Sequence, residues 1–92
     1  MNDTKNQPNK MNQIETLRHA ARGYETKALK SIASMSTKQI NVLSELILEF
    51  PENDSNREKV AGLRSVRAAA IDVIIERIGE VAGDFFMDEL GL

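Results

Sequence analysis

The sequence contains no cysteine, no tryptophan, one histidine and two prolines among its 92 residues. The absence of cysteine excludes disulfide bonds and thiolate metal ligands, and a single histidine excludes a zinc site built from histidines alone. Aromatic residues make up only 4% of the chain, so large rings contribute little to its core. Few groups remain for nucleophilic or metal-assisted catalysis. We therefore expect a protein that is not an enzyme and that needs no metal or other cofactor.

Long apolar runs and a secretory signal are also missing. The densest apolar run, over residues 68–75, is interrupted by Asp72 and is much shorter than the ~20 residues that cross a bilayer. The first thirteen residues are polar throughout, whereas a signal peptide has an apolar centre. The sequence predicts a cytoplasmic protein that does not contact membranes.

The chain is long enough for one small domain only, with a mass of 10.3 kDa, 41% hydrophobic residues and a net charge of −2. A domain of this size buries about 60% of the surface that its unfolded chain exposes, so its own core is small. A second subunit would add buried apolar surface. We therefore expect a homodimer.

Helical periodicity is the main feature that the sequence does contain. Residues 1–11 are rich in Asn, Gln and Lys and show no apolar repeat, which is typical of a disordered arm. From residue 12 onward, apolar residues recur every three or four positions, and capping patterns begin at Asn12, Ser36 and Ser55. We predict one all-α domain over residues 12–92, a small bundle with helices at about 13–33, 37–50 and 55–89.

Single residues refine these boundaries. Pro51 disfavours helical geometry at the residue before it and so ends the second helix. The helix over 37–50 has a main apolar stripe, but Val42 and Leu48 fall outside it, so we expect neighbours on more than one side of this helix. Four glycines mark places where the first and third helices can bend: Gly23, Gly62, Gly79 and Gly83.

The late part of the third helix carries an apolar stripe that comprises Ile71, Ile74, Ile78, Val81, Phe85 and Phe86. Such a stripe forms either the core of the chain or a seam between two subunits that binds a partner. Two of the three phenylalanines lie within eight residues of the end of the sequence, where an isolated helix frays. Another surface is expected to cover them, and the choice between core and dimer seam stays open.

An acidic ladder with a strict four-residue interval lies opposite this stripe and comprises Asp72, Glu76, Glu80, Asp84 and Asp88. Like charges four residues apart destabilise a helix by a few tenths of a kcal/mol each. The ladder is either a solvated face or a docking face for a basic partner, which is another protein or the chain's own N-terminal part. Residues 1–38 hold seven basic and three acidic side chains, and residues 39–92 hold five and eleven, which gives net charges of +4 and −6.

Arg64 and Arg67 lie three residues apart, where the apolar stripe would otherwise extend backward. In one interpretation they lie at the edge of the core and pair with Glu45 and Glu49 of the second helix. In the other they form a clamp for an anion or a carboxylate, because guanidinium groups bind such ligands with two hydrogen bonds.

Two candidate metal-binding motifs lack residues that such sites need. Asp54, Asn56 and Glu58 resemble the start of a calcium loop, but its sixth position is Lys59, where glycine is needed. Glu15 and His19 could supply two ligands of a metal site, but no second such pair exists.

Three functional hypotheses follow. We expect a non-enzymatic regulatory or accessory protein that binds another protein as a homodimer. An alternative is a nucleic-acid-associated protein that uses its basic first helix and N-terminal arm, which contain Lys5, Lys10, Arg18, Arg22, Lys27 and Lys30. A third is an acidic mimic that uses the ladder to occupy a nucleic-acid site.

Overall fold

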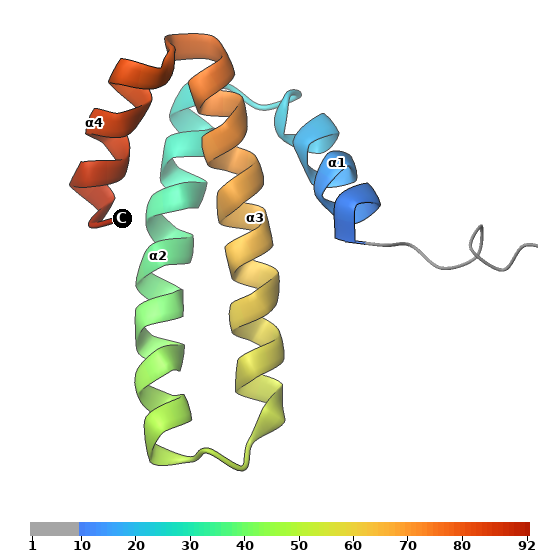
Figure 1. The fold of residues 1–92 in the computed structure, drawn as a ribbon, viewed down its shortest axis with the longest axis vertical. Helices are drawn as coiled ribbons and strands as arrows, with labels where there is room; N and C mark the ends of the chain where they lie inside the picture. Colours follow the sequence, from blue (N-terminus) through green and yellow to red (C-terminus); the bar gives the residue numbers. More distant parts are fainter. Residues whose placement is uncertain (1–9) are drawn as a thin grey trace, which may run out of the picture.

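The computed structural model describes residues 10–92, which form four α-helices and no strand (Figure 1). The helices are α1 (Lys10–Ala21), α2 (Thr26–Glu49), α3 (Asp54–Ile78) and α4 (Glu80–Leu90). The all-α prediction is therefore confirmed, but this part of the chain has four helices where three were predicted. Most of the predicted N-terminal arm, residues 1–9, lies outside the described residues, whereas residues 10 and 11 belong to α1.

α2 and α3 form a long antiparallel hairpin, and the two shorter helices lie beside one half of it (Figure 1). We call residues 26–37 and 66–78 the proximal half of the hairpin, and residues 38–65, which include the turn, the distal half. α1 lies next to α3 and α4 lies beyond α2, both along the proximal half (Figure 1). The core lies between these helices and includes Ala21, Leu29, Ala33, Ala70, Ile71, Val73, Ile74 and Phe86.

The first break in the helical chain lies at residues 22–25, so the predicted boundary at residues 34–36 is wrong. The backbone N–H groups of Gly23 and Tyr24 donate to the carbonyls of Ala20 and Ala21 at 3.1 and 3.0 Å, which closes a tight turn after α1. Ser36, expected to cap a helix, is instead buried inside α2. Its neighbour Thr37 donates its hydroxyl to the carbonyl of Ala33 at 2.9 Å, so polar side chains are accommodated within the helix.

The turn between α2 and α3 lies where Pro51 predicted it, but its capping residue differs. α2 ends at Glu49, with Phe50 as its C-cap. Asn53, and not Ser55, caps α3, because its side-chain oxygen accepts the backbone N–H of Ser55 at 3.1 Å.

The single helix predicted over residues 55–89 is two helices that meet at Gly79. This glycine has φ 91° and ψ 164°, a conformation that other residues rarely adopt, and it ends α3 and begins α4. α4 then folds back so closely that a Cβ added at Gly83 would lie 2.6 Å from Cγ1 of Ile75. Of the four glycines named as bend sites, Gly62 lies within the continuous helix α3.

Candidate protein-interaction surfaces

The predicted apolar stripe divides between the core of the chain and its surface. Four of its six members lie in the core or pack against it: Ile71, Ile74, Ile78 and Phe86. Val81 and Phe85 instead point outward from α4 and are 72% and 69% exposed. Gly79 causes this division, because the chain turns there and α4 presents a new face to the hairpin. Only Val81 and Phe85 therefore remain available to a seam with another molecule.

The acidic ladder is divided at the same glycine. Asp72 and Glu76 lie on α3, and both face α1. Asp72 accepts a hydrogen bond from Nε of Arg18 at 2.9 Å, and Glu76 accepts two from Arg22 at 3.1 and 2.8 Å. We call these four residues the α1 clasp. Two members of the ladder thus hold the N-terminal helix of the same chain, which is one of the two docking interpretations that the sequence allowed.

The α1 clasp shifts the pKa values of Arg18, Arg22 and Glu76. The hydrogen bonds from Arg22 hold the pKa of Glu76 below its ordinary value, although partial desolvation acts in the opposite direction. Hydrogen bonds to Asp72 and Glu15 raise the pKa of Arg18. Arg77 also contacts the turn between α1 and α2. It donates to the carbonyl of Arg22 and to the hydroxyl of Thr26, at 3.0 and 3.1 Å. The clasp therefore positions α1 by charge and hydrogen bonding.

The remaining acids of the ladder lie on α4 beside the exposed apolar residues. Glu80, Asp84 and Asp88 are all exposed, and Glu89, which lies outside the ladder, joins them. By helical spacing, Asp84 and Asp88 lie on one side of Val81 and Phe85, and Glu89 lies on the other. We call these residues the outer face of α4: an apolar stripe with carboxylates on both sides. Residues 80–92 contain no basic side chain.

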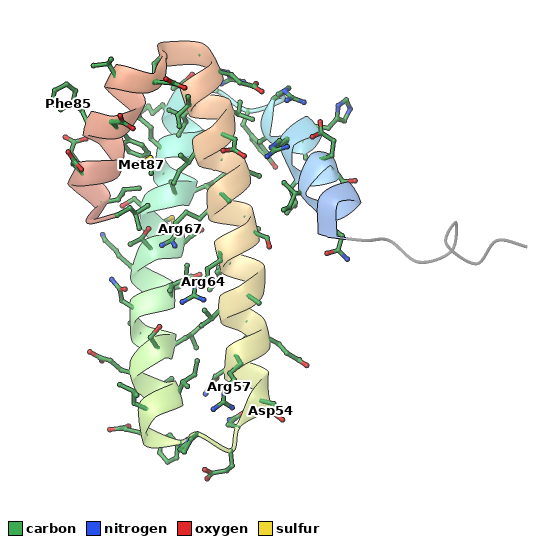
Figure 2. All side chains as sticks on the ribbon, in the orientation of Figure 1. Asp54, Arg57, Arg64, Arg67, Phe85 and Met87 are labelled. Carbon is green, nitrogen blue, oxygen red and sulfur yellow. The ribbon has the colours of Figure 1, made fainter. Side chains whose placement is uncertain are left out.

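Three arginines of α3, Arg57, Arg64 and Arg67, lie along the distal half and around its boundary with the proximal half, and they point across the hairpin toward α2 (Figure 2). Arg67 donates to the hydroxyl of Thr37 at 3.3 Å and is half-buried. Arg64 lines a shallow cavity with Ile47 and Arg57, and Arg57 pairs with Asp54 at 3.1 Å. The expected ion pairs with the two glutamates of α2 are not formed among the described residues. The clamp interpretation of Arg64 and Arg67 stays a prediction.

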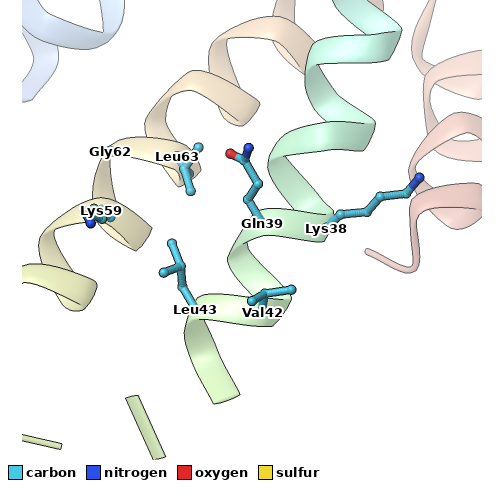
Figure 3. A pocket seen from close by; sticks show the side chains of 7 residues that line it. All are labelled: Lys38, Gln39, Val42, Leu43, Lys59, Gly62 and Leu63. Atoms are coloured by element: carbon cyan, nitrogen blue, oxygen red, sulfur yellow. The ribbon is translucent and has the colours of Figure 1, made fainter. Parts of the chain in front are cut away.

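The opposite side of the hairpin has an apolar groove in its distal half, shown in Figure 3. The groove has a volume of about 690 Å³ and lies between α2 and α3. Leu63 of α3 and Leu43 of α2 point toward one another across it (Figure 3). Its lining residues are Lys38, Gln39, Val42, Leu43, Lys59, Gly62 and Leu63. No sequence motif marks this groove, and its only advance signal is the position of Val42 outside the main stripe of its helix.

The groove continues the surface on which α1 packs. Its lining residues on α3, at positions 59, 62 and 63, lie seven residues before positions 66, 69 and 70, which line a smaller cavity beneath α1. Residues seven apart on a packed helix face nearly the same direction. α1 therefore covers the proximal part of one continuous surface and leaves the distal part open.

Two features were sought in the part of the chain that the structure describes: a metal-binding group and a membrane span. Within it, no group of three or more histidine or acidic side chains is arranged to hold a metal ion. None of its helices combines the length and apolarity of a membrane span. Comparisons of the chain with models of protein families, with curated proteins and with solved structures find no significant match.

Proposed function

We propose that this protein is a non-enzymatic regulatory or accessory protein that acts by binding protein surfaces and that it is a homodimer. One observation carries the proposal: large apolar side chains are exposed in the distal half and on α4. Leu48 is 83% exposed, and Val42, Phe50, Val81 and Phe85 are each more than half exposed. Apolar patches bordered by charged residues are typical of protein-binding sites.

Energetics favour association of these surfaces with another protein. Fully burying one exposed Leu or Phe side chain contributes about 1.5–3 kcal/mol. A protein of 92 residues has a total unfolding free energy of only about 5–14 kcal/mol. Covering a few of these side chains is therefore a large gain on the scale of this molecule's own stability.

The nucleic-acid alternative is disfavoured by the α1 clasp. Arg18 and Arg22 are paired with carboxylates at 2.8 Å, so they could contact phosphates only after these ion pairs break. Lys30 lies 5.6 Å from the centre of the Phe86 ring, in a cation–π arrangement. The acidic-mimic hypothesis meets the same objection, because Asp72 and Glu76 are paired and Gly79 places the other three acids on a separate helix.

Light scattering across a range of protein concentrations tests the homodimer. At tens of micromolar we expect a mass twice 10.3 kDa, with a decrease on dilution. A mass of 10.3 kDa at every concentration would contradict it. Fluorescence anisotropy with labelled duplex DNA and RNA, at low and moderate salt, tests the alternative, and micromolar binding that weakens with salt would replace our proposal.

A further inference from the structure

Two uncovered apolar surfaces among the described residues carry opposite charge: the groove of the distal half and the outer face of α4. We propose that the outer face of α4 in one copy of this protein docks in the groove of a second copy. This inference rests on the homodimer proposed above and specifies its contact.

The groove has the properties of a site for an amphipathic helix. Val42, Leu43 and Leu63 supply an apolar floor. A Cβ added at Gly62, which lines the groove, would meet no heavy atom within 4 Å, so there is open space beside the backbone of α3 at this residue. A volume of about 690 Å³ accommodates an aromatic ring together with its neighbouring side chains.

The outer face of α4 supplies matching side chains. Phe85 is the largest exposed apolar residue on this helix, and Val81 lies one turn before it. Buried aromatic residues at the centre of an interface contribute a large share of its binding energy. α4 has 11 residues and is about 16 Å long, whereas the stretch of α2 from residue 38 to residue 49 measures about 18 Å. α4 is thus short enough to lie along the distal half of α2.

Charge selects this occupant over a neutral one. Lys38 lies on the α2 side of the groove and Lys59 on the α3 side, and no acidic residue lines it. Both lysines are exposed, and neither makes an ion pair with a described residue. A helix with carboxylates on both sides of an apolar stripe places one near each lysine, and the outer face of α4 has this arrangement. Such pairs steer association and fix orientation, while burial of Phe85 supplies affinity.

The position of the two surfaces allows the contact to form twice in one dimer. α4 lies beside the proximal half, and the groove lies in the distal half (Figures 1 and 3). When two hairpins align antiparallel about a twofold axis, α4 of each copy reaches the level of the other copy's groove. A closed dimer with two equivalent contacts buries both surfaces of each copy.

The test uses one variant on each side of the contact, measured by sedimentation equilibrium. Phe85→Asp places a charge on the outer face of α4, and Gly62→Trp fills the groove. Each should raise the dimer dissociation constant at least about 30-fold, as loss of an interface hot spot does. Circular dichroism should show unchanged helix content, because Phe85 is 69% exposed and position 62 has open space.

Mixing the two variants provides a readout that misfolding cannot imitate. A Phe85→Asp copy keeps an intact groove, and a Gly62→Trp copy keeps an intact α4, so the mixed pair retains one of the two contacts. We expect the mixture to form heterodimers, seen by native mass spectrometry, at concentrations where each variant alone is monomeric. Absence of these heterodimers would overturn the proposal.

Leu48→Asp is the comparison variant, because Leu48 is 83% exposed on α2 but does not line the groove. It should raise the dissociation constant much less than either of the other two variants. If Leu48→Asp abolishes the dimer and the other two variants do not, the proposed contact is wrong while the homodimer stands. If the unmodified protein is monomeric throughout, the homodimer itself is wrong.

Discussion

The two halves of the α2–α3 hairpin are both apolar between the helices but differ in what covers them. In the proximal half, Leu29 and Ile74 are fully buried because α1 and α4 pack against the hairpin. In the distal half, Leu43 and Ile47 are only half-buried, because no third helix lies beside them. The proximal half therefore supplies most of the stability, and the distal half presents apolar surface that a partner can cover.

Residue size explains part of this difference. Around residue 70, α3 contains alanines at positions 68–70, two of which are 2% exposed, and small side chains let neighbouring helices approach closely. The first turns of α3 are instead rich in charged and polar residues, and even Asn56 is buried there. The distal half thus packs one helix against one other, and its outer surfaces stay open.

The largest predicted difference between the halves is in the unfolding free energy that is lost when an isoleucine is replaced by alanine in each. Ile74→Ala removes a fully buried side chain and should lower the unfolding free energy by about 2–5 kcal/mol. Ile47→Ala removes a half-buried one and should cost about 1 kcal/mol or less in the monomer. Urea unfolding followed by circular dichroism, at a concentration where the protein is monomeric, measures both. Equal losses would contradict the comparison.

Replacement of two glycines by alanine is the next test, because the two substitutions should change the unfolding free energy in opposite directions. Gly83→Ala places a Cβ 2.6 Å from Cγ1 of Ile75, and such overpacking costs about 1–3 kcal/mol. Gly62→Ala meets nothing within 4 Å in the middle of α3 and should stabilise the protein by about 0.5–1 kcal/mol. Adding Ile75→Ala to Gly83→Ala should cost less than the sum of the two single losses, because it removes the clashing atom. Strict additivity in this double variant would show that the close contact is unimportant.

A smaller effect is expected from opening the α1 clasp. Arg22→Gln removes the charge that pairs with Glu76 at 2.8 Å and should loosen α1 without changing the rest of the hairpin. Amide hydrogen exchange resolves this, because backbone groups of α1 should exchange faster while those of α2 and α3 keep their protection. Lys27→Gln is the control, because it removes a charge from an exposed residue outside the clasp. Equal exchange of α1 in both variants would mean that the clasp does not hold this helix.

The fold class was predictable because helical periodicity runs through the described chain, whereas the breaks depend on single residues in their context. The chain breaks at Gly23 and Gly79, which the sequence marked only as bend sites, and it continues through Ser36, which resembled a cap. Ser36 stays helical because it is buried against neighbouring helices, a tertiary effect that local patterns do not contain.

The candidate surfaces were only partly predictable, because they too depend on where the helical chain breaks. The spacing of the acidic ladder assumed one straight helix, so it placed Asp72 and Asp88 on a common face that Gly79 divides. The groove depends on which part of the hairpin α1 and α4 leave open, and this arrangement has no local sequence signal. The outward position of Phe85 and the inward position of Phe86 likewise followed only after α4 was known to fold back.

The smallest expected effect is the acid sensitivity of the α1 clasp. Arg22 holds the pKa of Glu76 below its ordinary value, so this carboxyl stays ionised to lower pH in the folded protein than in the unfolded chain. The contribution of the pair is fully present above the unfolded pKa, about 4.3, and is lost as pH falls through the lower folded value.

We therefore expect protection of α1 against hydrogen exchange, corrected for intrinsic rates, to decrease below about pH 4 before that of α3 decreases. Glu15 also lies near Arg22, with a closest approach of 3.7 Å. Glu76→Gln should weaken protection of α1 at neutral pH and flatten its acid dependence, because the uncharged amide no longer titrates. If the Gln variant loses protection over the same pH range and to the same extent as the unmodified protein, a group other than Glu76 holds α1, and the clasp must be assigned to that group instead.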